Sequence, residues 1–220
     1  MNARVEKLAN SIDSKSIAER LAGSSPASGT MDYKNTNTAY VTGVAIGDGN
    51  LSNSNGRAVK LRVTCDNKYP KLMGRISKSL QELFPENKVS LYARKENCTE
   101  VYVHSNKLEN ILGWKALEGS KFNQNVRVPS WIFYEKEYMR NCLRGLFETD
   151  GSVYKDRKYT YTNFTTIIHG LSQDVQIMID RLGYSSTTQS SVQKGNKRKF
   201  VTRVCKNSID FIKEVGIKKE

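Results

Sequence analysis

Hydrophobic and polar positions follow the same order twice along the chain. The first segment with helical spacing opens at Pro70 and has its apolar positions at Leu72, Ile76, Leu80 and Leu83. The same spacing returns 99 positions later, at Leu171, Val175, Ile179 and Leu182. We therefore predict two helices with equivalent buried faces and an internal repeat of the chain.

Strands are predicted on both sides of each helix, because apolar and polar residues alternate there with a period of two. The predicted strands cover residues 57–64, 88–94 and 100–104 in the first copy, and 159–164, 187–193 and 199–204 in the second. The order predicted for each copy is αββαββα, and these segments account for three of its four strands. The fold class is α+β with two pseudo-symmetric halves, residues 33–134 and 135–220, behind an N-terminal helix and flexible linker over residues 1–32.

Each half opens with a helix that contains glycine and ends in Asp-Gly. The first helix carries Gly43 and Gly47 before Asp48, and the second carries Gly145 before Asp150. Glycine in a helix interior costs about 1 kcal/mol relative to alanine, so its presence indicates a close approach of another backbone. A single Asp-Gly after a helix is an ordinary turn, whereas two equivalent copies indicate that the helices pack together and bring both aspartates to one end.

Two carboxylates at the negative ends of two helices repel each other unless a cation lies between them. Hard divalent ions prefer such oxygen ligands, and a pair of carboxylates that holds Mg²⁺ beside a basic surface is typical of phosphodiester cleavage. The chain has only two histidines, and its four cysteines are scattered without a C-x-x-C pair. This composition argues against a zinc site or a disulfide framework.

With these two motifs the sequence resembles the LAGLIDADG homing endonucleases, in the monomeric form that carries both motifs in one chain. The resemblance implies that the motif helices form the interface between the halves. It also implies that Asp48 and Asp150 bind the catalytic metals, helped by the backbone carbonyls of Gly47 and Thr149. Ile46 stands where the second motif has Glu148, and this position is usually structural in the family.

Members of that family often have a lysine just before the proline that corresponds to Pro129. Val126-Arg127-Val128 stands there in this chain. The resemblance therefore leaves three alternatives for the residue that organises the attacking water: Lys121, Arg127, or no such residue.

The net charge of +13 predicts a polyanionic partner. No apolar run is long enough to span a membrane and no signal segment opens the chain, so we expect a cytoplasmic or organelle-matrix protein. A curved antiparallel sheet in each half can enter the major groove of duplex DNA, where Arg reads guanine and Asn or Gln reads adenine. The expected DNA-binding residues are Arg57, Lys60, Arg62, Ser90, Tyr92, Arg94, Lys155, Arg157, Lys158, Tyr159, Tyr161, Asn163, Gln189, Gln193, Lys197 and Lys199.

These features predict an intron-encoded, site-specific homing endonuclease that makes a double-strand break in a long DNA target. We expect a monomer that uses Mg²⁺, with Mn²⁺ or Ca²⁺ able to replace it for binding and Ca²⁺ unable to support cleavage. Two alternatives remain on the same fold. One is an RNA maturase, whose partner is intron RNA, and the other is a catalytically inactive DNA-binding regulator, which a helix-turn-helix within residues 3–22 would support.

Overall fold

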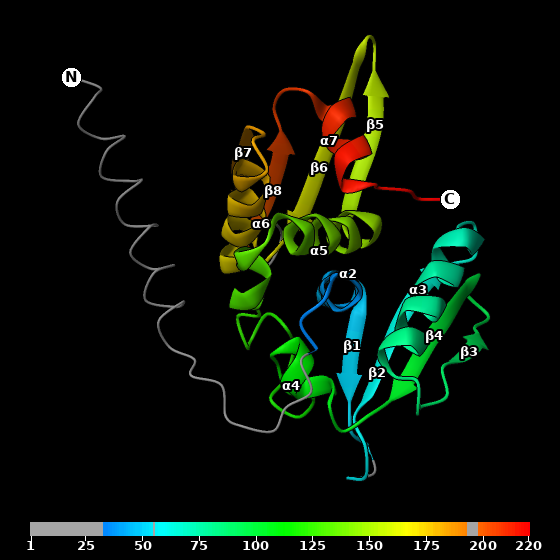
Figure 1. The fold of residues 1–220 in the computed structure, drawn as a ribbon. Coiled ribbons are helices and arrows are strands. Elements are labelled where there is room, and N and C mark those ends of the chain that lie inside the picture. Colours follow the sequence, from blue (N-terminus) through cyan, green and yellow to red (C-terminus); the bar gives the residue numbers. More distant parts are fainter. Residues whose placement is uncertain (1–32, 55, 193–197) are drawn as a thin grey trace. The chain divides into compact units, whose positions relative to one another are not determined.

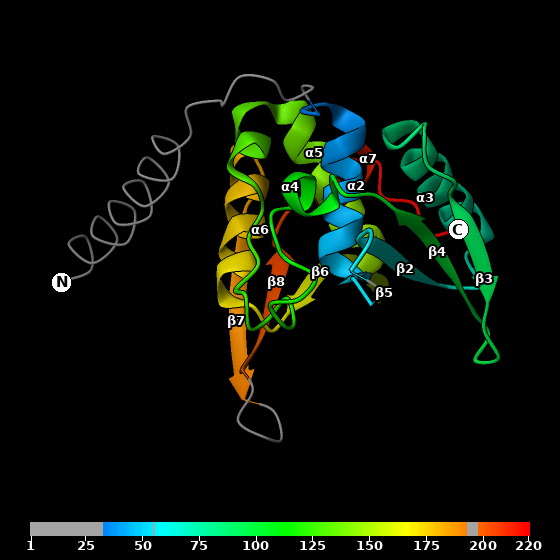
Figure 2. The same cartoon turned by 90° about the horizontal axis from the view of Figure 1, so that it is seen from below.

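Two four-stranded antiparallel sheets lie on opposite sides of a central pair of helices (Figures 1 and 2). The structure, a computed structural model, describes residues 33–54, 56–192 and 198–220. The predicted N-terminal helix and linker over residues 1–32 lie outside the described residues. Among those described, no helix combines the length and the apolar character needed to cross a bilayer.

The first half contains three helices and one sheet with strand order β1-β2-β4-β3. Its elements are α2 (Thr36–Gly47), β1 (Gly49–Ser52), β2 (Lys60–Asp66), α3 (Pro70–Leu83), β3 (Ser90–Ala93), β4 (Cys98–His104) and α4 (Leu108–Leu112). A segment containing the short 3-10 helix η1 (Ser130–Tyr134) leads into the second half.

The second half repeats this arrangement with strand order β5-β6-β8-β7. Its elements are α5 (Lys136–Thr149), β5 (Gly151–Asp156), β6 (Tyr159–Thr166), α6 (His169–Arg181), β7 (Ser186–Val192), β8 (Arg198–Val204) and α7 (Ser208–Val215). The predicted α+β fold with two αββαββα units is therefore confirmed.

The predicted apolar helix faces form the core of each half. All four apolar positions of α3 are buried against β2 and β4, and their counterparts on α6 are buried against β6, β7 and β8. The apolar residues of β2, Leu61 and Val63, are fully buried on the same side of the sheet. The opposite face of each sheet is consequently left for polar side chains.

Helices α2 and α5 pack together closely because glycine lies at their crossing. A Cβ atom added to Gly43 would lie 2.2 Å from the carbonyl oxygen of Cys142, and one added to Gly145 would lie 2.4 Å from the carbonyl oxygen of Tyr40. Both distances are far below van der Waals contact. The absence of side chains at these two positions therefore sets the separation of the two halves, as the sequence predicts.

Two details differ from the sequence-based expectation. The strand predicted at residues 57–64 runs from Lys60 to Asp66, so Arg57 lies in the preceding loop. Lys155, which we expected on the DNA-binding surface, lies in β5 directly opposite Thr160 of β6. Its side chain thus belongs to the face opposite that of Tyr154 and Tyr161, because neighbouring residues of a strand point to opposite faces.

Candidate active site

The two motif aspartates occupy equivalent positions at the ends of the central helices. Asp48 is the C-terminal cap of α2, and its N–H donates to the carbonyl of Val44 at 3.1 Å. Asp150 caps α5 in the same way, donating to Leu146 at 2.9 Å. Both residues are exposed, so both carboxylates are open to an incoming ligand.

Electrostatics connects the two carboxylates. Partial desolvation and then the negative charge of Asp48 raise the pKa of Asp150 to about 6. Desolvation also raises the pKa of Asp48. The charges of Lys121 and Lys219 oppose both shifts, so the same two ammonium groups act on both aspartates. The structure therefore brings two carboxylates and two lysines into one site.

Each lysine caps the end of one motif helix. The ammonium of Lys121 donates to the carbonyl of Ile46 at 2.6 Å and also contacts the carbonyl of Gly47. Lys219 donates to the carbonyl of Thr149 at 2.9 Å and to that of Gly151 at 2.6 Å. The bonds to Ile46, Gly47 and Thr149 satisfy carbonyls that a helix end leaves without partners, whereas Gly151 is the first residue of β5. Desolvation lowers the pKa of both lysines, and the aspartate charges partly counteract this effect.

Lys219 is the site residue that sequence reasoning missed. It lies four residues after α7, whereas Lys121 lies nine residues after α4. The two lysines share only a place after the last helix of their half, so the repeat gave no signal at an equivalent position. The tail after α7 is held against the first half: Leu72 of α3 donates its N–H to the carbonyl of Glu220 at 2.8 Å. Lys218 donates its N–H to the buried carboxylate of Glu148 at 3.1 Å. These two contacts fix the backbone on either side of Lys219.

Glu148 is a structural residue at the junction of the two halves. It is only 1% exposed, and it accepts hydrogen bonds from the hydroxyl of Tyr40 at 2.8 Å and from the guanidinium groups of Arg75 and Arg144 at 3.2 and 3.1 Å. Tyr40 and Arg75 belong to the first half, whereas Arg144 belongs to the second. Glu148 therefore joins the halves and does not face the ligand.

Arg127, one of the two residues predicted to organise the attacking water, is engaged elsewhere. Its guanidinium binds both oxygens of the buried Asp174 on α6, at 2.7 Å and 2.6 Å. This bidentate ion pair holds the segment before η1 onto the second half. Of these two residues, Lys121 is the one whose charge lowers the pKa of the aspartates. We therefore do not propose a catalytic role for Arg127.

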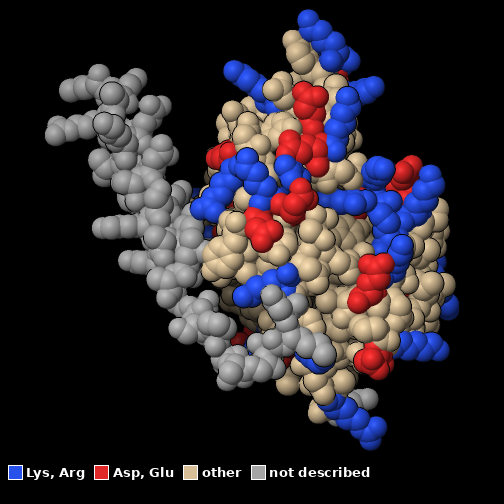
Figure 3. Space-filling model, in the orientation of Figure 1, with Lys and Arg blue, Asp and Glu red and all other residues tan. Residues whose placement is uncertain are grey.

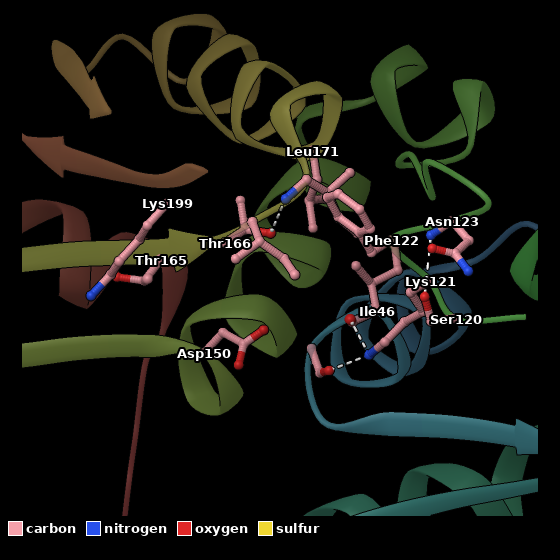
Figure 4. Close-up of a pocket in the computed structure, with 13 residues that line it drawn as sticks. Ile46, Ser120, Lys121, Phe122, Asn123, Asp150, Thr165, Thr166, Leu171 and Lys199 are labelled. Atoms are coloured by element: carbon pink, nitrogen blue, oxygen red, sulfur yellow. Dashed lines mark hydrogen bonds between the residues drawn. The ribbon is translucent and has the colours of Figure 1, made fainter. Parts of the chain in front are cut away.

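A cavity of about 670 Å³ adjoins Asp150 (Figure 4). Lys121 and Asp150 lie on its wall, and the segment from Ser120 to Asn123 faces β6 and the start of α6 across it. The remaining lining residues are Ile46, Gly47, Thr165, Thr166, Ile167, Ile168, Leu171 and Lys199. The cavity is thus bordered by residues of both halves.

The donors at the site are those that Mg²⁺ prefers. Within the described residues, no group of three or more His, Cys, Asp and Glu side chains could hold a metal ion. Two exposed carboxylates are nevertheless sufficient, because Mg²⁺ commonly takes one or two carboxylates and completes its ligand shell with waters and substrate phosphates. The carbonyls of Gly47 and Thr149, predicted as further ligands, already accept hydrogen bonds from lysine.

Most predicted DNA-binding residues share the outer face of a sheet. In the first sheet Arg62 and Ser90 both lie opposite Tyr102, and Tyr92 lies on the same face as Lys60. In the second sheet this face carries Tyr159, Tyr161, Asn163, Gln189 and Lys199.

Among the other described residues that we predicted to bind DNA, Lys155 lies on the opposite face of β5, and the rest lie in loops or beside strand ends. Arg94 follows β3, and Arg157 and Lys158 form the tip of the β5–β6 hairpin, where basic side chains protrude (Figure 3). Gln193 and Lys197 lie outside the described residues.

Part of the chain matches a known protein family. Residues 137–215 match the family described as "LAGLIDADG-like domain". A DNA polymerase of Thermococcus sp. (strain GE8) is 33% identical over 102 residues, which are 43% of this chain and 6% of that protein. The ATP-dependent DNA helicase Hel308 of Thermococcus kodakarensis is 25% identical over 163 residues, or 72% of this chain and 14% of that protein. The chain thus spans only a small part of either relative.

Comparison with solved structures shows the fold. A mesophilic variant of the homing endonuclease I-DmoI matches with a TM-score of 0.61 and 16% identity, covering 82% of this chain and 94% of the other. I-DmoI in complex with DNA and Mn matches with a TM-score of 0.60 and 17% identity, covering 82% and 96%. Full-length WhiA from Thermatoga maritima matches with a TM-score of 0.57 and 14% identity, covering 93% and 62%.

Proposed function

The chain contains a LAGLIDADG-like domain and has the fold of the monomeric, two-motif homing endonuclease I-DmoI, and on that premise we propose that it is a site-specific, metal-dependent DNA endonuclease. Its two catalytic halves would be residues 33–134 and 135–220. One observation carries the proposal: Asp48 and Asp150 end two packed helices and lie within the field of the same two lysines.

Asp48 and Asp150 would hold the divalent ions through their exposed carboxylates. A bound Mg²⁺ would neutralise charge on the attacking and leaving oxygens of the phosphodiester. Lys219 uses two of its N–H groups on the carbonyls of Thr149 and Gly151 and has a third to donate to water or to a phosphate oxygen. Lys121 places a second ammonium within the field of both aspartates. The two carboxylates and the two lysines would together serve both strands of the duplex.

Mg²⁺ is the ion that we propose, with Mn²⁺ or Ca²⁺ able to replace it for binding and Ca²⁺ unable to support cleavage. Structures of I-DmoI with DNA have been determined with Mn and with Ca, and one variant with its target DNA in the presence of Mg. The oxygen-only donor set of this chain agrees with the same group of ions.

Double-stranded DNA is the proposed partner, bound across the outer faces of the two sheets. The protein would act as a monomer, because the α2–α5 contact that joins its halves lies within one chain. The net charge of +13 favours a binding reaction driven largely by phosphate neutralisation.

The test is cleavage of a randomised duplex library with Mg²⁺, with the cut ends sequenced, followed by cleavage of a plasmid that carries the selected site. Asp48→Asn and Asp150→Asn should each lower double-strand cutting by orders of magnitude, since either change removes a charge from the metal ligands. Both variants should still shift the selected duplex in a gel with Ca²⁺. Asp156→Asn, at the exposed end of β5, is the control that should cut like the wild type.

Full double-strand cutting by either site variant would remove the aspartates from the mechanism. Preference for RNA over duplex DNA in competition would instead indicate a maturase.

A DNA-binding protein without cleavage activity is the second candidate. Lysine ammonium groups already donate to the carbonyls of Gly47 and Thr149, so they compete with a metal ion for these two oxygens. WhiA, which matches 93% of this chain, shows that the fold is not confined to proteins named as homing endonucleases. Sequence-selective binding with no cutting of the selected site in Mg²⁺ or Mn²⁺ would favour this candidate.

A further inference from the structure

An acidic residue is buried on the face of the first sheet that would meet DNA. Glu100 of β4 is only 4% exposed. It lies directly opposite Thr64 of β2 and Tyr92 of β3, so it shares their outer face and not the face that packs on α3. A carboxylate on a surface that binds DNA repels the phosphates and weakens binding. An acidic residue at this position is therefore unexpected.

Two arginines compensate the buried charge. The Nη1 atom of Arg62 lies 3.5 Å from Oε1 of Glu100, and Nη2 of Arg94 contacts the same oxygen. Within the described chain, no donor reaches this oxygen with the geometry of a hydrogen bond. Its charge is therefore balanced by the two guanidinium groups, whose side chains remain 36% and 38% exposed.

The fold does not require an acid at this position. The two sheets have matching registers, and the residue of β8 that corresponds to Glu100 is Val201, which lies opposite Thr165 and Gln189. The second sheet therefore builds the same element with an uncharged residue. The acid and its two arginines belong to the surface chemistry of the first half alone.

We propose that Glu100 is a positioning residue that sets the DNA sequence preference of the first half by orienting Arg62 and Arg94. This inference rests on the proposed DNA-binding function. An arginine discriminates guanine when its planar fork is held so that two N–H groups meet O6 and N7. Glu100 contacts one terminal nitrogen of each guanidinium, and both arginine side chains stay partly exposed to an incoming duplex. Because Glu100 is itself buried, it acts through the arginines and not by contact with a base.

The test compares sequence preference with overall affinity for three proteins. Binding to a randomised duplex library in Ca²⁺ is measured for the wild type, for Glu100→Gln and for Asp66→Asn. Asp66 is the matched control, since it lies in β2 on the same face of the sheet as Glu100, and its ion pair in the described part of the chain is with the exposed Lys68. Both variants lose one negative charge. Both should therefore bind random duplex somewhat more tightly than the wild type does.

Only Glu100→Gln should lose discrimination, by about tenfold at one or two base pairs. Arg62→Lys, which keeps the charge but not the planar fork, should lose discrimination at an overlapping position, with thermal melting used to verify that each variant is folded. In the Arg62→Ala background, the change Glu100→Gln should reduce base discrimination by less than it does in the wild-type protein.

Two results would overturn the proposal. One is an unchanged base preference in folded Glu100→Gln or, if that variant does not fold, in Arg62→Lys. The other is an equal loss of preference in Asp66→Asn, which would mean that charge alone is responsible. A wild-type protein with no preference among duplexes would overturn the proposed function as well, so the two failures are distinguishable.

Discussion

The glycine at the helix crossing offers the most direct test of how the two halves are joined. In Gly43→Ala the new Cβ would lie 2.2 Å from the carbonyl oxygen of Cys142, 3.0 Å from its carbon and 3.1 Å from the nitrogen of Leu146. All three atoms belong to the backbone of α5, so no side-chain rotation can relieve the contact. The two helices must move apart.

The magnitude follows from two opposing contributions. Overpacking of a well-packed interior costs about 1–3 kcal/mol, and a clash with backbone belongs at the upper end. Alanine regains about 1 kcal/mol of helix propensity relative to glycine. We therefore expect the free energy of unfolding of Gly43→Ala to fall by about 1–2 kcal/mol, which lowers the melting temperature by about 2–4 °C per kcal/mol in a chain of this length.

Gly74→Ala is the matched control. Gly74 lies within α3, and a Cβ added there meets nothing within 4 Å. The same substitution should therefore stabilise the protein by up to about 1 kcal/mol. Urea and thermal unfolding, followed by circular dichroism, measure both variants.

Cleavage is the second measurement on this pair. Separating α2 from α5 displaces Asp48 relative to Asp150, and a displacement of about 1 Å in a catalytic site can cost about a hundredfold in rate. Gly43→Ala should thus cut more slowly than Gly74→Ala under conditions where both are folded. If Gly43→Ala proves as stable as Gly74→Ala, the proposed close contact of the two helices is wrong.

Three further predictions concern the groups around the site. Glu148→Gln should lower the free energy of unfolding by about 1–3 kcal/mol, because the buried side chain loses its charged hydrogen bonds. The folded fraction of this variant should still cut DNA, and a folded variant that does not cut would contradict the structural role of Glu148. Lys219→Met should slow cleavage strongly while Lys218→Met does not, as plasmid assays with equal amounts of bound duplex would show; equal rates would exclude Lys219 from the site. At limiting Mg²⁺, initial cleavage rates should fall as the pH is lowered through about 6. The pKa of Asp150 is raised to about 6, and a proton on its carboxylate competes with the metal. A rate that does not change with pH in this range would count against Asp150 as a ligand.

The two-half architecture could be predicted from the sequence because its signals are local. Helical spacing and strand alternation record which face of each element is buried, and their return after 99 positions indicates one topology used twice. Gly43 and Gly145, each ahead of an Asp-Gly, likewise record where two backbones meet. The strands β1 and β5 had no such signal. The β1 sequence, GNLS, is too short to show alternation, and both strands became evident only from their pairing with β2 and β6.

The partners of the polar residues were decided by the tertiary structure alone. Arg127 binds Asp174, 47 positions away, and Lys219 is carried to the site by a tail that docks on the other half. The face of Lys155 depends on strand register, where a shift of one residue reverses every side chain. Hydrophobic burial leaves a periodic trace in the sequence, whereas an ion pair or a hydrogen bond depends on which distant segments the fold places side by side. The sequence therefore predicts the frame and the two aspartates, and the folded chain selects the lysines and arginines that act around them.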